Sequence, residues 1–262
     1  MHDSVRNVMI DPQPKRVFVT GGTGFLGYRV VRALLEENAA VTVLVRPGAE
    51  DKLGALRGHV QWVQGDVWNP ASLKGRARGH QVVVHLVGGI KPEPKRGLTF
   101  RHLNFVSARN VAQMAVSDGV PHLMLLSATV KPPGVQSGYI DSKREAEDYL
   151  RKTGLTWTIV RAPPLYMPGQ RRNATYVLLS ALRLIPLVGL LANPLAPLSV
   201  EIVARGIARL ALSADSTHDR LITPGRLRAL GWIAAPRRAI PSTAAAADED
   251  ESFDEPPFGW QP

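Results

Sequence analysis

An α/β fold, with a doubly wound parallel sheet covered by helices on both faces, is predicted from three features of the sequence. Apolar runs typical of strands alternate with helix-like segments from residue 17 onward. This alternation predicts parallel strands joined by crossover helices. A glycine-rich loop separates the first strand from the first helix, and 262 residues with 45% hydrophobic content are enough to bury a large core.

Strands and helices are expected in a regular order. The expected strands span residues 17–20, 41–45, 60–64, 82–87, 123–127 and 156–161. The expected helices span residues 25–37, 100–118 and 142–153, and Gly119 and Gly154 stand where a left-handed residue would end a helix. After residue 161 come a proline-rich loop, an apolar stretch and a helix-like segment at 200–212, which leave room for only a small C-terminal lobe.

Composition and charge exclude several classes of protein. The chain has no cysteine, which excludes disulfides, iron–sulfur clusters and thiolate zinc sites and fits a reducing compartment. Residues 248–262 hold six acids and no Lys or Arg, so the net charge of +10 divides into −6 there and +16 elsewhere. Such a body attracts phosphorylated cofactors and acidic lipids. Nucleic acid is not an expected partner, because the basic residues are scattered and accompany no recognition motif.

Two segments bear on cellular location. Residues 1–15 lack the apolar core of a signal peptide, so a cytoplasmic location is expected. The longest apolar stretch, residues 177–191, is interrupted by Arg183 and Pro186 and is too short to span a bilayer as one helix. A peripheral association of this stretch with a membrane surface or a membrane complex stays open.

The glycine loop has the spacing G-x-x-G-x-x-G between a strand and a helix. Gly21 is expected to permit the tight turn, Gly24 to let backbone N–H groups approach a pyrophosphate, and Gly27 to let the helix pack closely on the strand. The alternative is a turn that only joins the two elements, and the βα units that follow argue against it. The loop therefore predicts a Rossmann-type dinucleotide site. Its expected contacts come from Gly21, Thr23, Gly24, Phe25, Leu26 and Gly27.

The residue after the second strand indicates which dinucleotide is bound. Sites selective for NAD place an acid there to hold the ribose 2′-hydroxyl. Here Arg46 stands nineteen residues after Gly27, and the first acids are Glu50 and Asp51. An arginine at this position can pair with an adenosine 2′-phosphate, so NADP(H) is expected in preference to NAD(H). The alternative is that Arg46 is an ordinary surface arginine.

A tyrosine and a lysine four residues apart, Tyr139 and Lys143, are expected on one face of a helix near its start. A neighbouring ammonium lowers the pKa of a tyrosine by stabilising the phenolate, and it can also hydrogen-bond a nicotinamide ribose. Ser127, at the end of the fifth strand, is expected to steady a substrate carbonyl. These three residues are the catalytic candidates. The alternative is that Lys143 forms only a surface ion pair with Glu147.

Two further polar positions have two interpretations each. Asp66, followed by Val67 after the third strand, is expected either to reach the adenine or to act as a turn aspartate. Asn104 lies on an apolar helix face and is expected to fix the main chain, with a water in a proton relay as the alternative. The seven histidines show no metal-like spacing, so no metal site is expected.

The order of these residues, with residues 84–88 and 161–163, resembles that of the extended and atypical short-chain dehydrogenases/reductases, which include NAD(P)-dependent epimerases and dehydratases. The resemblance covers residues 16–212. Within that superfamily the chain is most similar to proteins related to the 39 kDa accessory subunit of respiratory complex I. The resemblance implies cofactor contacts from Val87 and Gly88, a ribose contact from Lys143 and a backbone contact from Pro163 near the nicotinamide.

Three functions are compatible with this resemblance. The first is an NADP(H)-dependent oxidoreductase acting on a carbonyl or hydroxyl group of a small, apolar molecule, with Tyr139 passing a proton. The second is a non-catalytic NADP(H)-binding subunit or assembly factor of a membrane respiratory or quinone-related complex. The third is an NAD(P)-dependent epimerase or isomerase, although the short C-terminal lobe argues against a nucleotide-sugar substrate.

The chain is expected to divide into four parts. Residues 1–15 form a flexible N-terminus, 16–161 the dinucleotide-binding core, 162–233 the small C-terminal lobe and 234–262 a disordered acidic tail. The tail has too few apolar residues to offset the entropy of ordering. The substrate and the oligomeric state do not follow from the sequence.

Overall fold

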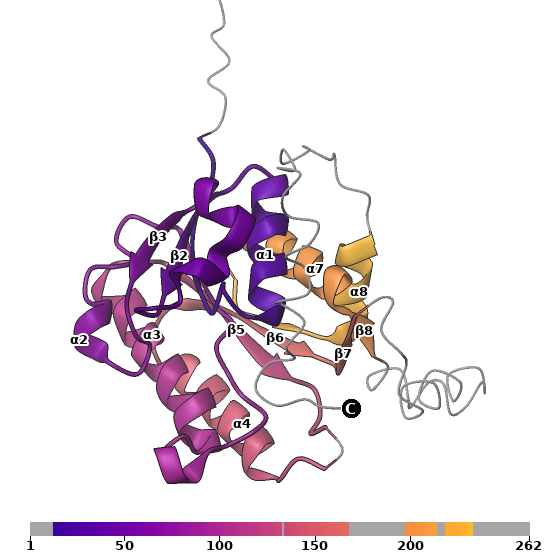
Figure 1. Ribbon diagram of the computed structural model, residues 1–262. Coiled ribbons are helices and arrows are strands. Elements are labelled where there is room, and N and C mark those ends of the chain that lie inside the picture. The colour runs from indigo at the N-terminus through magenta and orange to yellow at the C-terminus, as the bar shows by residue number, and fades with distance from the viewer. Residues whose placement is uncertain (1–12, 133, 168–196, 214–217, 233–262) are drawn as a thin grey trace, which may run out of the picture.

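A seven-stranded parallel sheet forms the centre of the protein in the computed structural model, which describes residues 13–132, 134–167, 197–213 and 218–232 (Figure 1). The strand order is β3-β2-β1-β4-β5-β6-β9. Every neighbouring pair is parallel. The strands are β1 Arg16–Thr20, β2 Ala40–Val45, β3 Gln61–Gln64, β4 Val82–His85, β5 His122–Ala128, β6 Thr156–Ala162 and β9 Arg220–Ile222. The predicted fold class is confirmed.

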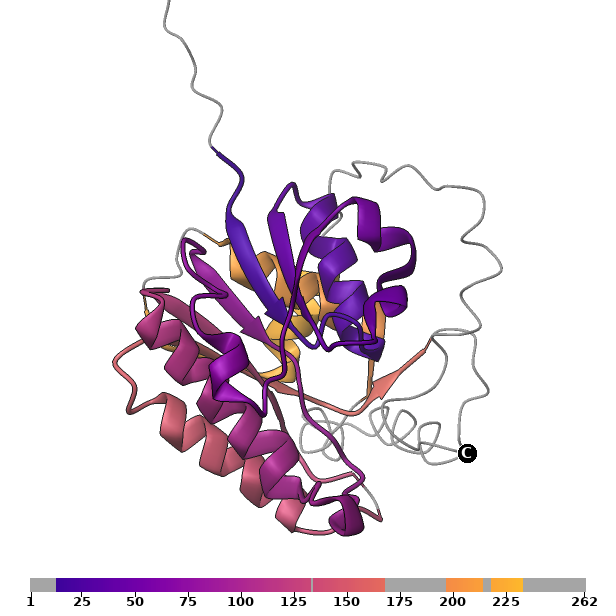
Figure 2. The ribbon, with the colours of Figure 1, turned by 60° about the vertical axis from the view of Figure 1, so that its left-hand side comes forward.

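Helices cover both faces of the sheet. On one face α1, Phe25–Glu36, packs against α7, Val200–Leu212, which in turn contacts α8, Pro224–Trp232. On the other face lie α3, Ser107–Ser117, and α4, Gly138–Leu150. Figure 2 shows the two layers from another side, with the magenta and pink helices apart from the indigo and orange ones. The sheet therefore lies between two helical layers, as parallel sheets generally do.

Strand residues alternate between the two helical layers. Val17 and Val19 of β1 belong to the core under α1 and α7, whereas Phe18 belongs to the core under α3. In β4, Val82 and Val84 likewise belong to the core under α1 and α7, and Val83 belongs to the core under α3. All six side chains are almost completely buried. Successive side chains of a strand point to opposite faces, so an uninterrupted apolar run is what a sheet covered on both sides requires.

Shorter elements connect the strands. They are the 3₁₀ segments Glu50–Gly58 and Pro94–Arg96, the helix α2 Pro70–Leu73, the π-helical turn η3 His102–Val106, and the strand pair β7 Leu165–Tyr166 and β8 Leu198–Ser199. The helix expected at 100–118 is therefore divided, with η3 leading into α3. Helix α4 begins four residues earlier than expected. Gly119 and Gly154 have φ of +71° and +76°, which confirms them as left-handed residues after helices.

The described part of residues 162–233 joins the main sheet. Strand β9 pairs with β6, with Thr158 opposite Arg220, and α7 packs on α1. A separate lobe stays a prediction only for residues 168–196. These residues, which include the apolar stretch 177–191, lie outside the described part of the chain. The expected flexible segment up to residue 12 and the acidic tail also lie outside them. In the part that the structure describes, no helix is long and apolar enough to cross a membrane.

Candidate functional site

The glycine loop forms a tight turn between β1 and α1. Gly21 has φ of +79°, and its carbonyl oxygen accepts a hydrogen bond of 3.1 Å from the N–H of Gly24. A Cβ on Gly27 would lie 1.9 Å from that same oxygen, so α1 packs directly on the loop backbone. The close packing expected of Gly27 is confirmed. Only a residue without a side chain fits at this contact.

The first turn of α1 is open to an anion. Gly24 is the N-cap residue and offers no side chain to the helical N–H groups, and the first turn holds no acid. A Cβ on Gly24 would meet only the oxygen of Gly21, at 3.4 Å. Unpaired N–H groups and the positive end of the helix dipole favour a phosphate at such a position. The loop therefore fits the pyrophosphate of a dinucleotide, and the individual contacts of its residues stay predictions.

The turn after β4 lies against the glycine loop. A Cβ on Gly21 would be 3.0 Å from the backbone nitrogen of Val87, and one on Gly88 would be 2.6 Å from Nζ of Lys143. Strands β1 and β4 are neighbours where the strand order reverses. Ligands of doubly wound sheets bind at such a switch point, outside the carboxyl ends of the strands. The structure thus brings the loop, the Val87–Gly88 turn and Lys143 together there.

Asn104 holds the main chain beside this turn. Its Oδ1 accepts a hydrogen bond of 3.1 Å from the N–H of Gly89, and its Nδ2 donates to the carbonyl of Gly89, also at 3.1 Å. The same Nδ2 lies within hydrogen-bond distance of the Phe100 carbonyl and of the Ser142 hydroxyl. The side chain is fully buried. The structural role expected for Asn104 is confirmed.

His85, at the end of β4, was not singled out from the sequence. Its Nδ1 lies 2.7 Å from Oγ1 of Thr20 and its Nε2 3.4 Å from Oγ of Ser107. Burial, together with the charge of Lys143, lowers the pKa of His85 to about 3. The imidazole is therefore neutral and supports the strand ends beneath the loop. The available signal was a single polar residue at the carboxyl end of an apolar strand.

Tyr139 lies in the first turn of α4, in an apolar cluster with Phe100 and Ala128. The Phe100 and Tyr139 rings meet edge to face, with centroids 6.1 Å apart. Burial raises the pKa of Tyr139 to about 12, and the charge of Arg144 lowers it only in part. The expectation that Lys143 lowers this pKa is therefore wrong for the protein without cofactor, because loss of hydration outweighs the nearby charges.

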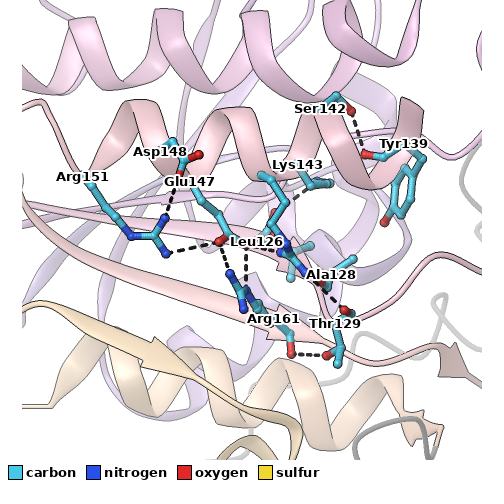
Figure 3. Close-up of polar contacts among 12 residues, drawn as sticks. Leu126, Ala128, Thr129, Tyr139, Ser142, Lys143, Glu147, Asp148, Arg151 and Arg161 are labelled. Atoms are coloured by element: carbon cyan, nitrogen blue, oxygen red, sulfur yellow. Dashed lines mark hydrogen bonds and ion pairs between the residues drawn. The ribbon is translucent and has the colours of Figure 1, made fainter. Parts of the chain in front are cut away.

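Lys143 is buried one helical turn after Tyr139. Its side chain points toward β5, where Nζ donates a hydrogen bond of 3.1 Å to the carbonyl of Leu126 (Figure 3). Burial lowers the pKa of Lys143 to about 8, although the charge of Glu147 acts to raise it. The residue is 4% exposed. The alternative of a surface ion pair with Glu147 is excluded, and the lysine faces the site.

Ser127 belongs to a buried ion cluster. Its hydroxyl donates a hydrogen bond of 2.6 Å to Oε1 of Glu147 and accepts one of 3.3 Å from Arg144. Glu147 is fully buried and pairs with Arg144, Arg151 and Arg161 (Figure 3). The single hydroxyl proton of Ser127 is thus donated to a carboxylate. The expected contact of Ser127 with a substrate carbonyl is not supported by this geometry.

The charge of Glu147 is maintained by its neighbours. Burial alone would raise the pKa of this carboxyl, but hydrogen bonds from Arg161 and Ser127 and the charges of Arg144 and Arg161 hold it below its ordinary value. Of the three arginines around this carboxylate, Arg144 is the one whose charge acts on Tyr139, and Arg151 also pairs with Asp148. Sequence reasoning missed this cluster because its members come from β5, α4 and β6.

The residues expected at the adenine end follow β2 and β3. Oδ1 of Asp66 accepts a hydrogen bond of 3.0 Å from the N–H of Trp68, which is a turn geometry. Val67 is buried, and its carbonyl accepts from Nδ2 of Asn110. Arg46 is exposed. The turn role of Asp66 is confirmed, whereas adenine contacts of Asp66 and Val67, and a contact from Pro163 after β6, stay predictions.

The family is decided by a match over more than half of the chain. A family model described as NAD(P)H-binding matches residues 21–181. The chain belongs to this NAD(P)H-binding family. The match begins at Gly21 and so includes the glycine loop, the Val87–Gly88 turn and the Tyr139–Lys143 pair. Among the described residues, no cluster of three or more potential metal ligands occurs.

Several proteins similar to this chain are named as reductases or dehydrogenases. Ceramide reductase of Caulobacter vibrioides is 35% identical over 153 residues, which are 58% of this chain and 47% of that protein. Sterol-4-alpha-carboxylate 3-dehydrogenase, decarboxylating, of Bos taurus is 30% identical over 118 residues, which are 45% of this chain and 31% of that protein. The matches therefore span a third to a half of these relatives. What the family match shows is an NAD(P)H-binding domain.

Solved structures share the fold. The dTDP-glucose 4,6-dehydratase DesIV from Streptomyces venezuelae, solved with NAD and TYD bound, has a TM-score of 0.57 and 23% identity, covering 79% of this chain and 75% of that one. The enzyme WbmG of Bordetella bronchiseptica, in complex with NAD, has a TM-score of 0.58 and 18% identity, covering 82% and 74%. At these identities the likeness shows the Rossmann-like fold.

Proposed function

We propose that this protein is an NADP(H)-dependent oxidoreductase acting on a carbonyl or hydroxyl group of a small, apolar molecule, with Tyr139 as the proton donor or acceptor. One observation carries the proposal. Tyr139 and Lys143 lie buried on one face of α4, and Nζ of Lys143 approaches Gly88 in the turn that contacts the glycine loop. This geometry supports proton transfer by Tyr139 near the dinucleotide site.

The protonation states of the pair support reduction of a carbonyl. With a pKa of about 12, Tyr139 is a neutral phenol at neutral pH and can donate its proton to a developing alkoxide. With a pKa of about 8, Lys143 is mostly an ammonium at neutral pH. One of its N–H groups is donated to Leu126, and the ammonium has two further donors that can serve a ribose hydroxyl. The bound dinucleotide supplies or accepts the hydride.

The surroundings of Tyr139 support an apolar substrate. Phe100, Ala128 and Tyr139 form a small apolar cluster, against which Ile90 and Val135 pack. Two proteins similar to this chain are named for reactions of ceramide and of a sterol carboxylate, both of which have large apolar parts. A hydrophobic surround also favours proton transfer away from bulk water.

The surroundings of Arg46 support NADP(H) over NAD(H). The carboxylate of Glu50 accepts hydrogen bonds from the N–H of Gly48 and from Nε2 of Gln64, and Asp51 pairs with Arg57. The two acids nearest in sequence to Arg46 are thus engaged elsewhere. The guanidinium remains available to a 2′-phosphate.

A matched pair of tyrosine variants tests the proposal. Tyr139→Phe is expected to abolish NADPH oxidation with a panel of apolar ketones while leaving the NADPH affinity nearly unchanged, because only the hydroxyl proton is lost. Tyr149→Phe, on the same helix and in edge contact with Phe105, is the control and is expected to retain turnover. Equal activity of Tyr139→Phe and the wild type would refute the role of Tyr139.

One observation favours a second candidate, a non-catalytic NADP(H)-binding subunit or assembly factor of a membrane respiratory or quinone-related complex. Ser127 donates its proton to Glu147, so the expected catalytic set lacks one member. In that case a phenotype of gene deletion would be rescued by Tyr139→Phe but not by a bulky residue at Gly24. The likeness to the 39 kDa subunit, the peripheral membrane contact, the cytoplasmic location and epimerase activity stay predictions.

A further inference from the structure

Trp68 lies beside Arg46 at one end of the sheet. Arg46 follows β2 directly and Trp68 follows β3 by four residues, and the two strands are parallel neighbours with Val45 opposite Gln64. The central carbon of the guanidinium lies over the indole ring, 6.0 Å from its centroid. This distance is at the outer limit of a cation–π interaction. The two side chains therefore meet where the adenosine half of a dinucleotide is expected.

The orientation of Trp68 is fixed by three contacts. Its backbone N–H donates to the carboxylate of Asp66, and its indole Nε1 donates a hydrogen bond of 3.1 Å to the carbonyl of His102. The indole also stacks on the His102 imidazole, with centroids 5.6 Å apart and an interplanar angle of 21°. A half-buried indole held in this way is a rigid platform, although it lies in a loop.

An aromatic ring holds a guanidinium differently from a carboxylate. A carboxylate partner would use two of the five N–H donors of Arg46 and cancel its charge, whereas a ring face uses none of them. In the described parts of the chain no carboxylate forms an ion pair with Arg46, and the nearby acids Glu50 and Asp51 bind Gln64 and Arg57. The guanidinium is thus positioned while its donors and charge are preserved.

We propose that Trp68 is a specificity-determining residue of the cofactor site, which positions the Arg46 guanidinium so that its N–H groups bind the 2′-phosphate of NADP(H). Trp68 acts through Arg46 and is a positioning residue. The inference rests on the NADP(H) preference in the proposed function and is independent of proton transfer by Tyr139.

The test is the ratio of NADP⁺ to NAD⁺ affinity, measured by calorimetry on the full chain. Arg46→Ala is expected to reduce this ratio about ten-fold or more, because a charge-assisted contact is lost. Trp68→Leu is expected to reduce it roughly two- to five-fold, the strength of an exposed cation–π contact, and Trp68→Phe less. In the Arg46→Ala background, Trp68→Leu is expected to change the ratio no further.

A second arginine–tryptophan pair provides the matched control. Arg57 lies over the ring of Trp62 with its central carbon 5.6 Å from the ring centroid. Trp62 packs against the core under α1 and α7, whereas Trp68 packs against the core under α3 on the other face of the sheet. Trp62→Leu is expected to leave the affinity ratio unchanged. Thermal unfolding of each variant identifies any loss of fold. The ratio of NADP⁺ to NAD⁺ affinity does not depend on the fraction of protein that is active, because both affinities are measured on the same sample.

Three outcomes separate the inference from the proposed function. Equal weakening of NADP⁺ and NAD⁺ by Trp68→Leu would make the indole an adenine contact and would overturn the inference. A reduced ratio that persists with Arg46 absent would overturn it too, since Trp68 would act by another route. If Arg46→Ala leaves the ratio unchanged, the NADP(H) preference itself fails, whatever Trp68 does.

Discussion

The contact between Gly27 and the glycine loop gives a perturbation whose effect can be worked out from distances. In Gly27→Ala the new Cβ would lie 1.9 Å from the oxygen of Gly21, 2.7 Å from its carbonyl carbon and 2.9 Å from Cα of Gly22. All three are backbone atoms, so no side-chain rotation relieves the clash. The loop and α1 must separate by more than about 1 Å to reach ordinary contact distances.

This separation has two costs. Overpacking of this kind destabilises a fold by about 1–3 kcal/mol, which in a chain of this size lowers the melting temperature by roughly 2–12 °C. Without the clash, alanine would stabilise the helix by about 1 kcal/mol relative to glycine. A fall in the melting temperature of Gly27→Ala therefore identifies the clash, whereas a rise would reflect helix propensity alone. Movement of the loop also removes N–H groups from a pyrophosphate. Loss of one such contact weakens NADP⁺ binding by about ten-fold or more.

Two further glycines separate the effects on fold and on binding. In Gly24→Ala the Cβ meets only one atom, at 3.4 Å, so the melting temperature is expected to stay near the wild-type value while NADP⁺ affinity falls. In Gly231→Ala the Cβ would lie 2.2 Å from the carbonyl oxygen of Ile202, at the contact between α8 and α7 and not in the glycine loop, so stability should fall while affinity is retained. Thermal unfolding and calorimetry measure both quantities. Wild-type stability and affinity in Gly27→Ala would refute the steric reasoning.

Two other predictions concern buried charges. The pKa of His85 falls from about 6.5 to about 3 on folding, so the unfolded chain binds more protons between these pH values. The contribution of His85 to the free energy of unfolding is therefore fully present above pH 6.5 and is lost as the pH falls toward 3. Urea unfolding from pH 7 to 4 should show this loss, on the order of a few kcal/mol, and a shallower slope in His85→Gln. Part of the slope remains in that variant because burial also lowers the pKa of His122 to about 4, and equal slopes would contradict a neutral native imidazole at position 85. Glu147→Gln is expected to destabilise the protein by about 3–5 kcal/mol, because Arg144 and Arg161 lose their buried counter-ion. Ser127→Ala removes one hydrogen bond to the same carboxylate and should cost only about 1–2 kcal/mol. Similar losses of stability in both variants would show that the ion pairs contribute little.

Much of the fold follows from the sequence because apolar runs and glycines report local requirements. The first six strands lie within two residues of their expected bounds, and Gly119 and Gly154 have the positive φ expected of them. Strand β9 was missed because a run of three residues carries no periodicity. It pairs with β6, a strand distant in sequence, and such pairing is a property of the whole fold.

The candidate site was predictable where one motif holds all the atoms concerned. The glycine loop and the helical spacing of Tyr139 and Lys143 are of this kind. The partner of Ser127 was not, because Glu147 comes from another element and its spacing favoured Lys143 instead. The raised pKa of Tyr139 was missed for a related reason, since the degree of burial depends on residues distant in sequence, such as Phe100. Spacing in the sequence predicts which residues share a face of a helix, whereas the burial of a side chain depends on the whole fold.

The π-helical turn His102–Val106 has a consequence for the geometry of the whole site. The carbonyl of His102 fixes the indole of Trp68, and two residues later Asn104 fixes Gly89 and contacts Ser142 on α4. One short turn therefore contacts both Trp68, at the expected adenosine end of the site, and Gly89, beside the Val87–Gly88 turn. Each helical residue turns the chain by about 100°, so inserting or deleting one residue between His102 and Asn104 would rotate one of these contacts out of line with the other.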